Sequence, residues 1–343
     1  MSAPLDGQVA LVAGATRAAG RGIALELAAA GAKVWCTGRS TRDHPATPGR
    51  PETIEETAEL IAAAGGEAMA VRVDHTVDAE VAALAARVEA EDGRVDILVN
   101  DIWGGDALTS WGAPFWRQEM ADVRTLVDRA LLSHWITARH FAPMMVAADR
   151  GLIVEVTDGY EAGYRGQILY DFIKAGVIRL AYGMAWDLAR TGVTALAVTP
   201  GFLRSEAILE GFGVTEANWR HAVAKEAEFA FSESPRYVGR AIAALAADPN
   251  VRAKAGAVFF AADLADEYGF TDADGSRPHF WRGVFARLDE ELAADGKLSP
   301  FAKGHASAAY MRGHLTPGDG ERMRTYAERL GWTKLGAGLQ PRD

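Results

Sequence analysis

Residues 8–22 read QVALVAGATRAAGRG, an apolar run (Gln8–Ala13) that ends in a turn of small residues (Gly14–Gly22). A helical stretch, Ile23–Ala30, follows the turn directly. In a strand–turn–helix unit, glycines let the backbone approach a pyrophosphate, and the N-terminus of the helix presents free N–H groups and a partial positive charge. A glycine cluster without this context is usually an ordinary turn. Here the context is complete, and it predicts a dinucleotide-binding turn with contacts from Gly14, Thr16, Arg17 and Gly20.

The alternation of strands and helices continues over most of the chain. Apolar runs predict further strands at residues 33–37, 67–73, 95–99, 152–157, 193–199 and 257–261. Helical periodicity predicts helices at residues 54–64, 79–91, 118–147, 168–190 and 235–247. Repeated units of this length imply right-handed crossovers. We therefore expect an α/β fold, a doubly wound parallel sheet with helices on both faces, whose site lies at the carboxyl ends of the strands.

Composition and charge narrow the class of protein. Of 343 residues, 49% are hydrophobic and 24% are charged, as in a globular protein with a large core. No apolar run reaches the roughly 20 residues that span a bilayer, and the net charge of −10 argues against a nucleic-acid partner. Cys36 is the only cysteine, and eight scattered histidines form no metal-binding pattern. Residues 1–6 lack the basic and apolar regions of a signal peptide, so we expect a cytoplasmic protein that handles small molecules.

The residues after the second strand predict which dinucleotide is bound. A site for NAD typically has an acidic residue about 20 positions after the glycine turn, where it holds the ribose 2′-hydroxyl. This chain has Arg39 and Ser40 there, with Arg17 in the turn itself. Guanidinium groups bind phosphate oxygens through paired hydrogen bonds, so the pattern favours NADP(H) over NAD. The alternative is that Arg39 is a solvated loop residue.

Tyr170 and Lys174 stand four residues apart at the start of a strongly helical stretch. Side chains at this spacing lie one turn apart on the same face of a helix. The Lys174 ammonium would then favour the phenolate of Tyr170 and lower its pKa from the usual value of about 10, as a proton donor requires. In isolation such a pair is usually a surface pair. The predicted nucleotide site makes an active-site pair the favoured interpretation.

Together these features resemble the short-chain dehydrogenase/reductase family, with its Rossmann-like fold, over residues 5–272. Residues 13–20 are similar to the family's TGxxxGxG turn, residues 99–102 to its NNAG stretch, and Tyr170–Lys174 to its YxxxK motif. The arginine after the second strand and the GLIV strand at residues 151–154 resemble the mammalian member-1 subgroup. By this resemblance, further cofactor contacts are expected from Asp74, Asn100, Lys174, Pro200, Gly201 and Ser205.

The resemblance implies an NADP(H)-dependent oxidoreductase that reduces a carbonyl or oxidises an alcohol. Tyr170 would donate a proton to the carbonyl oxygen as the cofactor delivers hydride to the carbon. Lys174 would lower the pKa of Tyr170 and hold the ribose hydroxyls of the nicotinamide half. Aromatic side chains in loops at the expected site end favour a bulky, cyclic or aromatic substrate. They are Trp103, Trp111, Phe115, Trp116, Tyr160, Tyr164, Phe202 and Trp219.

Several positions depart from the family pattern. The family's serine lies 12 or 13 residues before the tyrosine, and this spacing falls on Asp158 or Thr157. The hydroxyl of Thr157 could polarise a carbonyl. An ionised Asp158 would instead repel the developing alkoxide, unless burial or Tyr170 kept it protonated. Both remain candidates. Three further departures are Ala130 for the family's helical asparagine, Ala18 for the second glycine of the turn and Asp101 for the second asparagine of NNAG.

These departures leave three functional hypotheses. The first is the reductase described above. The second keeps the scaffold but uses Asp158 and Tyr170 as an acid–base pair for a non-redox dehydration, cyclisation or isomerisation. The third is a non-catalytic NADP-binding regulatory protein, and the retention of both Tyr170 and Lys174 argues against it. Product formed without any change in NADPH absorbance would distinguish the second hypothesis from the first.

The chain is expected to divide into two parts. Residues 1–275 are predicted to form the NADP-binding and catalytic domain, with an irregular, aromatic-rich insertion at residues 202–231. Residues 276–343, with helical stretches at 279–294 and 320–330, are predicted to form an extension. The extension is expected to pack on the same domain or at an oligomer interface; the alternative is that it partly covers the pocket. Because family members associate through their two long central helices, a homodimer or homotetramer is expected.

Overall fold

The computed structural model describes residues 3–159, 165–294, 329, 333–335 and 338–340. Its centre is a seven-stranded parallel sheet in the order β3-β2-β1-β4-β5-β6-β7. The predicted doubly wound parallel sheet is therefore confirmed. The strands are β1 (Val9–Ala13), β2 (Lys33–Gly38), β3 (Ala68–Arg72), β4 (Ile97–Asn100), β5 (Gly151–Val156), β6 (Val193–Thr199) and β7 (Val258–Phe260).

The order of the strands places the candidate site. The chain first runs outward from β1 to β3, then crosses to β4 on the other side of β1 and continues to β7. The direction reverses between β1 and β4, which is the point where sheets of this kind bind ligands. All residues of β1 and β6 are buried, because helices cover both faces of the sheet. This explains why the strands were visible in the sequence as continuous apolar runs.

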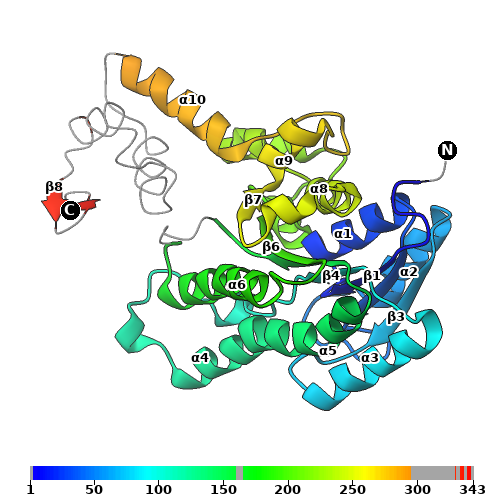
Figure 1. The fold of residues 1–343 in the computed structure, drawn as a ribbon. Helices are drawn as coiled ribbons and strands as arrows, with labels where there is room; N and C mark the ends of the chain where they lie inside the picture. Colours follow the sequence, from blue (N-terminus) through cyan, green and yellow to red (C-terminus); the bar gives the residue numbers. More distant parts are fainter. Residues whose placement is uncertain (1–2, 160–164, 295–328, 330–332, 336–337, 341–343) are drawn as a thin grey trace.

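Two layers of helices cover the sheet (Figure 1). One face packs against α1 (Ala18–Ala29), α2 (Ile54–Ala63), α8 (Pro235–Ala247) and α9 (Ala261–Tyr268). The other face packs against α3 (Asp78–Asp92), α5 (Ser133–Ala147) and α6 (Ile168–Asp187), and α4 (Met120–Val127) lies beside α6. The apolar side chains of the two layers form separate cores on the two faces of the sheet.

Helix α1 begins at Ala18, five residues before the predicted start at Ile23. The prediction was late because the first turns of the helix contain glycines, which serve tertiary packing. A Cβ atom at Gly22 would lie 2.0 Å from the Pro235 carbonyl oxygen, at the first residue of α8. A Cβ atom at Gly239 would lie 2.5 Å from the Gly22 carbonyl oxygen. Glycine is a poor helix former in isolation, which makes the start of α1 invisible to local propensity. Here it lets α1 and α8 cross in backbone contact.

The predicted helical region at residues 118–147 consists of α4, a π-helical turn (Asp128–Leu132) and α5. The Ser133 hydroxyl donates to the Arg129 carbonyl at 2.6 Å, and the Thr137 hydroxyl donates to the Ser133 carbonyl at 2.7 Å. Hydroxyls that bond the preceding turn in this way loosen a helix locally, and π turns are frequent at functional sites. Arg129, inside this turn, lines the cavity described below.

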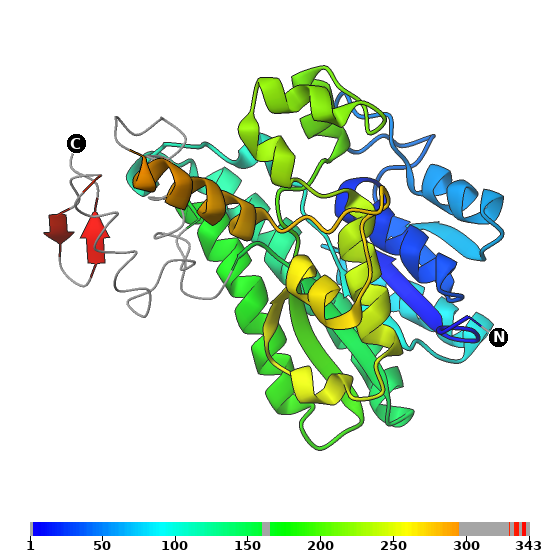
Figure 2. The ribbon, with the colours of Figure 1, turned by 90° about the horizontal axis from the view of Figure 1, so that it is seen from above.

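The insertion at residues 202–231, predicted to be irregular, contains one α-helix and two 3₁₀ turns. These are α7 (Glu206–Phe212), η4 (Trp219–Ala224) and η5 (Ala227–Phe231). The insertion has its own apolar cluster, formed by Val214, Trp219, Ala222 and Phe229. It stands beside the loop that follows β2 (Figure 2), and Arg50 of that loop bonds to Glu210 at 2.5 Å. The insertion therefore forms one wall of the molecule next to the glycine turn.

The C-terminal part begins with α10 (Phe280–Ala293), which agrees with the helix predicted at residues 279–294. Helix α10 contacts η5 of the insertion, so it packs on the domain that precedes it. The antiparallel strands β8 (Thr333–Leu335) and β9 (Gly338–Gln340) follow. Most of the helix predicted at residues 320–330 lies outside the described residues, and the boundary at residue 275 stays a prediction. Short 3₁₀ turns also occur at Asp106–Leu108, Phe115–Arg117 and Val251–Lys254.

Within the described part of the chain, none of the helices combines the length and apolar character that crossing a membrane requires. The same residues contain no group of three or more histidine, cysteine or acidic side chains arranged to hold a metal ion.

Replacement of Gly22 by alanine is expected to lower the free energy of unfolding by about 1–3 kcal/mol, because the new methyl group must push α1 and α8 apart. Thermal unfolding followed by circular dichroism measures the change. Gly211→Ala in α7 is the matched control, because nothing lies within 4 Å of a Cβ at that position. The control should be neutral or slightly stabilising, since alanine is the better helix former. A Gly22→Ala protein as stable as its parent would contradict the close crossing.

Candidate active site

A cavity of about 640 Å³ opens at the carboxyl ends of the strands, around the switch point between β1 and β4. Most residues predicted from the sequence line it: Gly14, Thr16, Arg17, Arg39, Ser40, Asp74, Thr157, Asp158, Tyr170, Lys174, Pro200, Gly201 and Ser205. Two predicted contacts lie behind the wall instead. Gly20 packs against Gly14, and Asn100 is fully buried with its amide donating to Glu155 Oε1 at 2.7 Å.

The glycine turn is held by backbone contacts that leave no space for side chains. Gly14 has a φ of +97°, and a Cβ atom there would lie 2.4 Å from the Asp101 carbonyl oxygen. A Cβ atom at Gly20 would lie 2.2 Å from the Gly14 carbonyl oxygen. Ala18, in place of the family's second glycine, has a φ of 47°. This left-handed conformation costs an L-residue about 1–2 kcal/mol, so the turn keeps its shape at some expense of stability.

The N-terminus of α1 binds an anion in this structure. The Ala18 N–H donates to both carboxylate oxygens of Glu206, at 2.9 and 3.2 Å. Glu206 is the first residue of α7, so the insertion reaches across to the glycine turn. The N–H groups and dipole at a helix N-terminus favour carboxylates and phosphates alike. The turn therefore fits the pyrophosphate of a dinucleotide, which would compete with Glu206 for this N–H.

Arginines gather where the cavity meets β2 and β3. Burial lowers the pKa of the Arg39 guanidinium; Asp74 opposes this, while the positive charges of Arg129 and Arg72 lower it further. Arg39 Nη1 lies 3.9 Å from an Asp74 carboxylate oxygen. Arg129 enters from the π-helical turn and donates to the Gly104 carbonyl at 3.3 Å. Clustered guanidinium groups of this kind favour an anionic ligand such as a phosphate.

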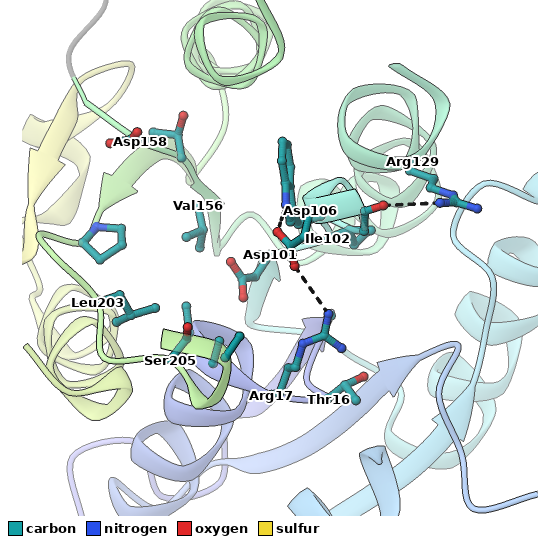
Figure 3. Close-up of a pocket in the computed structure, with 18 of the residues that line it drawn as sticks. Thr16, Arg17, Asp101, Ile102, Asp106, Arg129, Val156, Asp158, Leu203 and Ser205 are labelled. Carbon is teal, nitrogen blue, oxygen red and sulfur yellow. Dashed lines mark hydrogen bonds and ion pairs between the residues drawn. The ribbon is translucent and has the colours of Figure 1, made fainter. Parts of the chain in front are cut away.

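Arg17 links the glycine turn to the loop after β4. Its Nη2 lies 3.8 Å from an Asp106 carboxylate oxygen, and its Nη1 donates to the Thr47 hydroxyl at 3.4 Å. Figure 3 shows the pair of Arg17 and Asp106 in the middle of the cavity, with Arg129 on one side of it and Asp158 on the other. The cavity thus has a cationic end at Arg39 and Arg129 and a second end at Asp158.

At the second end, the Tyr170 hydroxyl donates to Asp158 Oδ2 at 3.1 Å. The hydroxyl of Thr157 instead donates to the Lys174 carbonyl of α6 at 2.8 Å. Of the two candidates for the serine position, Asp158 is therefore the one beside Tyr170. Successive residues at the end of a strand point in opposite directions, which explains why only one of the two can reach the tyrosine.

Lys174 and Asp101 modify each other's protonation at the same end. Burial lowers the pKa of the Lys174 ammonium, and the carboxylates of Asp101, Asp158 and Asp106 oppose that shift. Burial raises the pKa of Asp101 to about 7, although Lys174 and a hydrogen bond from the Gly20 N–H act in the opposite direction. Asp101 thus changes its charge near neutral pH at the point where the glycine turn meets the end of β4.

Two of the predicted aromatic residues pack directly against Tyr170. The Trp103 ring makes an edge contact with it at 5.3 Å between centroids, and the Trp111 ring a tilted contact at 5.2 Å. Lys174 Nζ lies 4.6 Å from the centroid of the Trp103 ring. Among the others, Phe202 lines the cavity, Trp219 is buried in the insertion, and Phe115 and Trp116 are exposed and do not line the cavity. Tyr160 and Tyr164 lie outside the described residues.

A buried pair that sequence reasoning missed supports this end of the cavity. His134 Nδ1 lies 2.5 Å from Glu155 Oε2, and His134 Nε2 lies 2.9 Å from the Ile102 carbonyl oxygen. A carbonyl oxygen only accepts hydrogen bonds, so Nε2 carries a proton in this arrangement. The pair ties α5, β5 and the loop after β4 together behind Asp101 and Trp103. No spacing pattern in the sequence joins His134 to Glu155.

Other contributors were also hidden from the sequence. Glu206 directly follows the predicted contact Ser205, and an acid at that place was the one available signal. Arg129 belongs to a helix whose π turn has no recognisable pattern. Phe280 and Trp281, from the part assigned to the C-terminal extension, line the cavity next to Phe202 and Gly201. The extension therefore contributes to the site.

Comparisons with known proteins agree with this geometry. The sequence profile of the short chain dehydrogenase family matches residues 8–210, from β1 through most of α7. The chain belongs to the short-chain dehydrogenase family. Its members are oxidoreductases that bind a nicotinamide cofactor, and the predicted family membership is confirmed.

Particular relatives extend the match beyond the profile. The human protein dehydrogenase/reductase SDR family member 1 is 34% identical over 280 residues, which covers 80% of this chain and 86% of the relative. A crystal structure of a hydroxysteroid dehydrogenase from Escherichia coli is 25% identical with a TM-score of 0.61, covering 75% of this chain and 95% of that one. A metagenomic short-chain oxidoreductase solved in complex with NADP is 27% identical with a TM-score of 0.55, covering 72% and 94%.

The raised pKa of Asp101 predicts a pH-dependent stability. In the unfolded chain an aspartate has a pKa of about 3.9, whereas in the fold the pKa of Asp101 is about 7. Between these values the folded state holds a proton that the unfolded state has lost, so this group lowers stability as the pH rises and adds no further change above about pH 7.

Asp101→Asn keeps an acceptor for the Gly20 N–H but cannot ionise. The difference in free energy of unfolding between this variant and its parent should grow as the pH rises from about 5 to 7. The growth should be at most roughly 1.4 kcal/mol per pH unit. Urea unfolding at several pH values measures the difference. A difference that stays constant across this window would show that Asp101 does not titrate there.

Glu206→Gln removes the carboxylate charge from the N-terminus of α1 and keeps the shape of the side chain. It should tighten binding of a nicotinamide dinucleotide about 2–5-fold, because an anion at a helix N-terminus is worth about 0.3–1 kcal/mol. Fluorescence titration measures the Kd. Glu210→Gln is the matched control, since this residue of the same helix bonds Arg50 rather than the turn. Weaker binding by the Glu206 variant alone would mean that Glu206 does not compete with the cofactor.

Proposed function

We propose that this protein is an NADP(H)-dependent oxidoreductase that acts on a polarised double bond, such as a carbonyl, in a bulky small molecule. The observation that carries the proposal is the cavity itself. The glycine turn and the arginine cluster lie at one end, and Tyr170 and Lys174 lie at the other. A dinucleotide that extends along this cavity would bring its nicotinamide to the tyrosine. The match to a short-chain oxidoreductase solved in complex with NADP adds support.

The cofactor, when bound, supplies the hydride, and the chain's residues perform the remaining steps. Arg39 and Arg129 would hold the phosphate end of the cofactor, and the Ala18 N–H would bind its pyrophosphate in place of Glu206. Tyr170 donates the proton to the heteroatom of the double bond. Lys174 supports this transfer by charge, although the carboxylates around it moderate its effect. Pro200 and Gly201, which line the cavity, would cover the nicotinamide end.

A non-redox reaction remains the second candidate, and the hydrogen bond between Tyr170 and Asp158 favours it. A carboxylate and a phenol within 3.1 Å form an acid–base pair that can move protons without any hydride. The two candidates differ in one readout. The non-redox enzyme forms product at constant NADPH absorbance, and the oxidoreductase consumes one NADPH for each product molecule.

The homodimer or homotetramer expected from the family is also part of the proposal. Apolar side chains are exposed along the central helices, and they include Trp135 on α5 (61% exposed) and Phe172 and Trp186 on α6 (57% and 67% exposed). Large exposed apolar residues on two neighbouring helices favour association. This surface supports an interface between copies of the chain through α5 and α6.

Turnover of NADPH with a panel of cyclic carbonyl and imine substrates tests the function. Tyr170→Phe should lower kcat about 10²–10⁴-fold, because the variant lacks the proton donor. Its Kd for NADPH should stay within a few-fold of the parent, since the phenol does not hold the phosphates. Tyr182→Phe, on the same helix but outside the cavity, is the control. A Tyr170→Phe enzyme with full activity would refute the assigned role of Tyr170.

Arg39→Asp should reverse the cofactor preference. The variant loses a charge-assisted contact worth about 1.5–3 kcal/mol to the 2′-phosphate and gains an acceptor for the 2′-hydroxyl of NADH. The Kd for NADPH should rise about 10–100-fold while that for NADH stays equal or falls. Arg42→Asp, in the same loop but paired with Glu59, is the control. An unchanged ratio of the two affinities would contradict the NADP(H) assignment.

A further inference from the structure

We propose that the double bond reduced at this site is a C=N bond, and that the substrate is a cyclic, aromatic imine that reacts as its iminium cation. This inference rests on the proposed function for the source of hydride. It goes beyond that function by naming the heteroatom and the charge of the substrate. The observations that carry it are the Asp158 carboxylate beside Tyr170 and the aromatic rings that pack against Tyr170.

The carboxylate determines which heteroatom is favoured at the reacting position. Asp158 Oδ2 lies 3.1 Å from the Tyr170 hydroxyl, so an atom that bonds to Tyr170 lies close to Asp158 as well. When hydride adds to a ketone, negative charge develops on oxygen, and Asp158 opposes it. When hydride adds to an iminium ion, the positive charge is present from the start on nitrogen and the adjoining carbon. Asp158 stabilises this bound cation.

The other charges at this end are compatible with a cationic ligand. Asp101 and Asp106 line the cavity together with Asp158, and the positive charges among them are Lys174 and Arg17, whose Nη2 lies 3.8 Å from an Asp106 oxygen. Arg165 is also close, but its Nη1 lies 2.9 Å from Asp171 and its Nε donates to the backbone carbonyl of Asp158. Asp158 and Asp101 stand where the family resemblance implies neutral side chains. Both substitutions make this end of the cavity more acidic.

The aromatic rings add a second means of binding a cation. Trp103 and Trp111 both pack against the Tyr170 ring, with centroid distances of 5.3 and 5.2 Å. The Lys174 ammonium already lies 4.6 Å from the Trp103 centroid, so this ring attracts a cation in the structure as it stands. Trp111 is 60% exposed and lines the same cavity. Aromatic rings beside a carboxylate suit a flat, cationic nitrogen ring.

The reaction balances without an additional reactant. The hydride of NADPH forms the new C–H bond at the iminium carbon, and the π electrons of the C=N bond become the lone pair of the product amine. NADPH is oxidised to NADP⁺ as the imine is reduced. An imine that enters unprotonated takes its proton on nitrogen from the Tyr170 hydroxyl, and the phenolate that results regains a proton from water. The product amine takes a further proton from water and leaves as an ammonium ion.

Equilibrium binding tests the ligand class without relying on turnover. Calorimetric titration of the full-length protein should show tetrahydroisoquinoline, an ammonium ion at neutral pH, binding at least tenfold more tightly than tetralol, its neutral carbocyclic counterpart. Asp158→Asn keeps the shape of the side chain and should remove this preference. Asp187→Asn, an exposed aspartate at the far end of the same helix as Tyr170, should keep it. Equal affinities in the parent, or a preference that survives in Asp158→Asn, would overturn the inference.

Turnover provides the second measurement. With NADPH, the parent should reduce dihydroisoquinoline at least tenfold faster, in kcat/KM, than tetralone. Asp158→Ser should invert this ratio, and its Kd for NADPH should match that of the parent, which shows that it has folded. Faster reduction of tetralone by the parent would overturn the inference while leaving the oxidoreductase in place. Amine binding that depends on Asp158, but without NADPH consumption, would sink the proposed oxidoreductase and leave the ligand class standing.

Discussion

The contact between the glycine turn and the end of β4 is the constraint on which the site depends. Gly14 and Gly20 leave no room for a side chain there, and the carbonyl and the carboxylate of Asp101 both lie against them. This contact sets the N-terminus of α1 at the floor of the cavity, where the Ala18 N–H binds an anion. It also places Asp101 next to Lys174 in a partly buried position. One backbone contact therefore joins the end of the cavity at the glycine turn to the end at Tyr170 and Lys174.

Charge is distributed unevenly along the cavity that results. Arg129 lies on one side of the cavity and Asp158 on the other (Figure 3). Arg39 adds positive charge at the first end, and the carboxylates of Asp101 and Asp158 act on Lys174 at the second. Coulomb interactions at a partly buried site are several times stronger than in water, so this separation would favour a ligand that is anionic at one end and cationic at the other. The buried pair of His134 and Glu155 holds the Ile102 carbonyl behind the second end.

Spacing along the chain did not settle which residue takes the serine position beside Tyr170. The distance from Tyr170 along the chain allowed either Thr157 or Asp158 to take the serine position. Only the path of the chain after β5 decides between them, since Thr157 bonds the Lys174 carbonyl and leaves Asp158 for the phenol. The start of α1 was placed too late for a related reason. The glycines that disfavour a helix locally are those that the packing against Gly14 and α8 requires.

The sequence by itself determined the sheet, the glycine turn, the Tyr170–Lys174 pair and the arginine after β2. Each of these depends on residues close together in the chain, where apolar runs and fixed spacings follow directly from strand and helix geometry. Only the tertiary structure decided that Glu206 meets the turn, that Arg129 joins Arg39, that His134 meets Glu155 and that Phe280 closes the wall. These side chains come from segments far apart in sequence, and their contacts exist only once the packing of whole elements has brought those segments together.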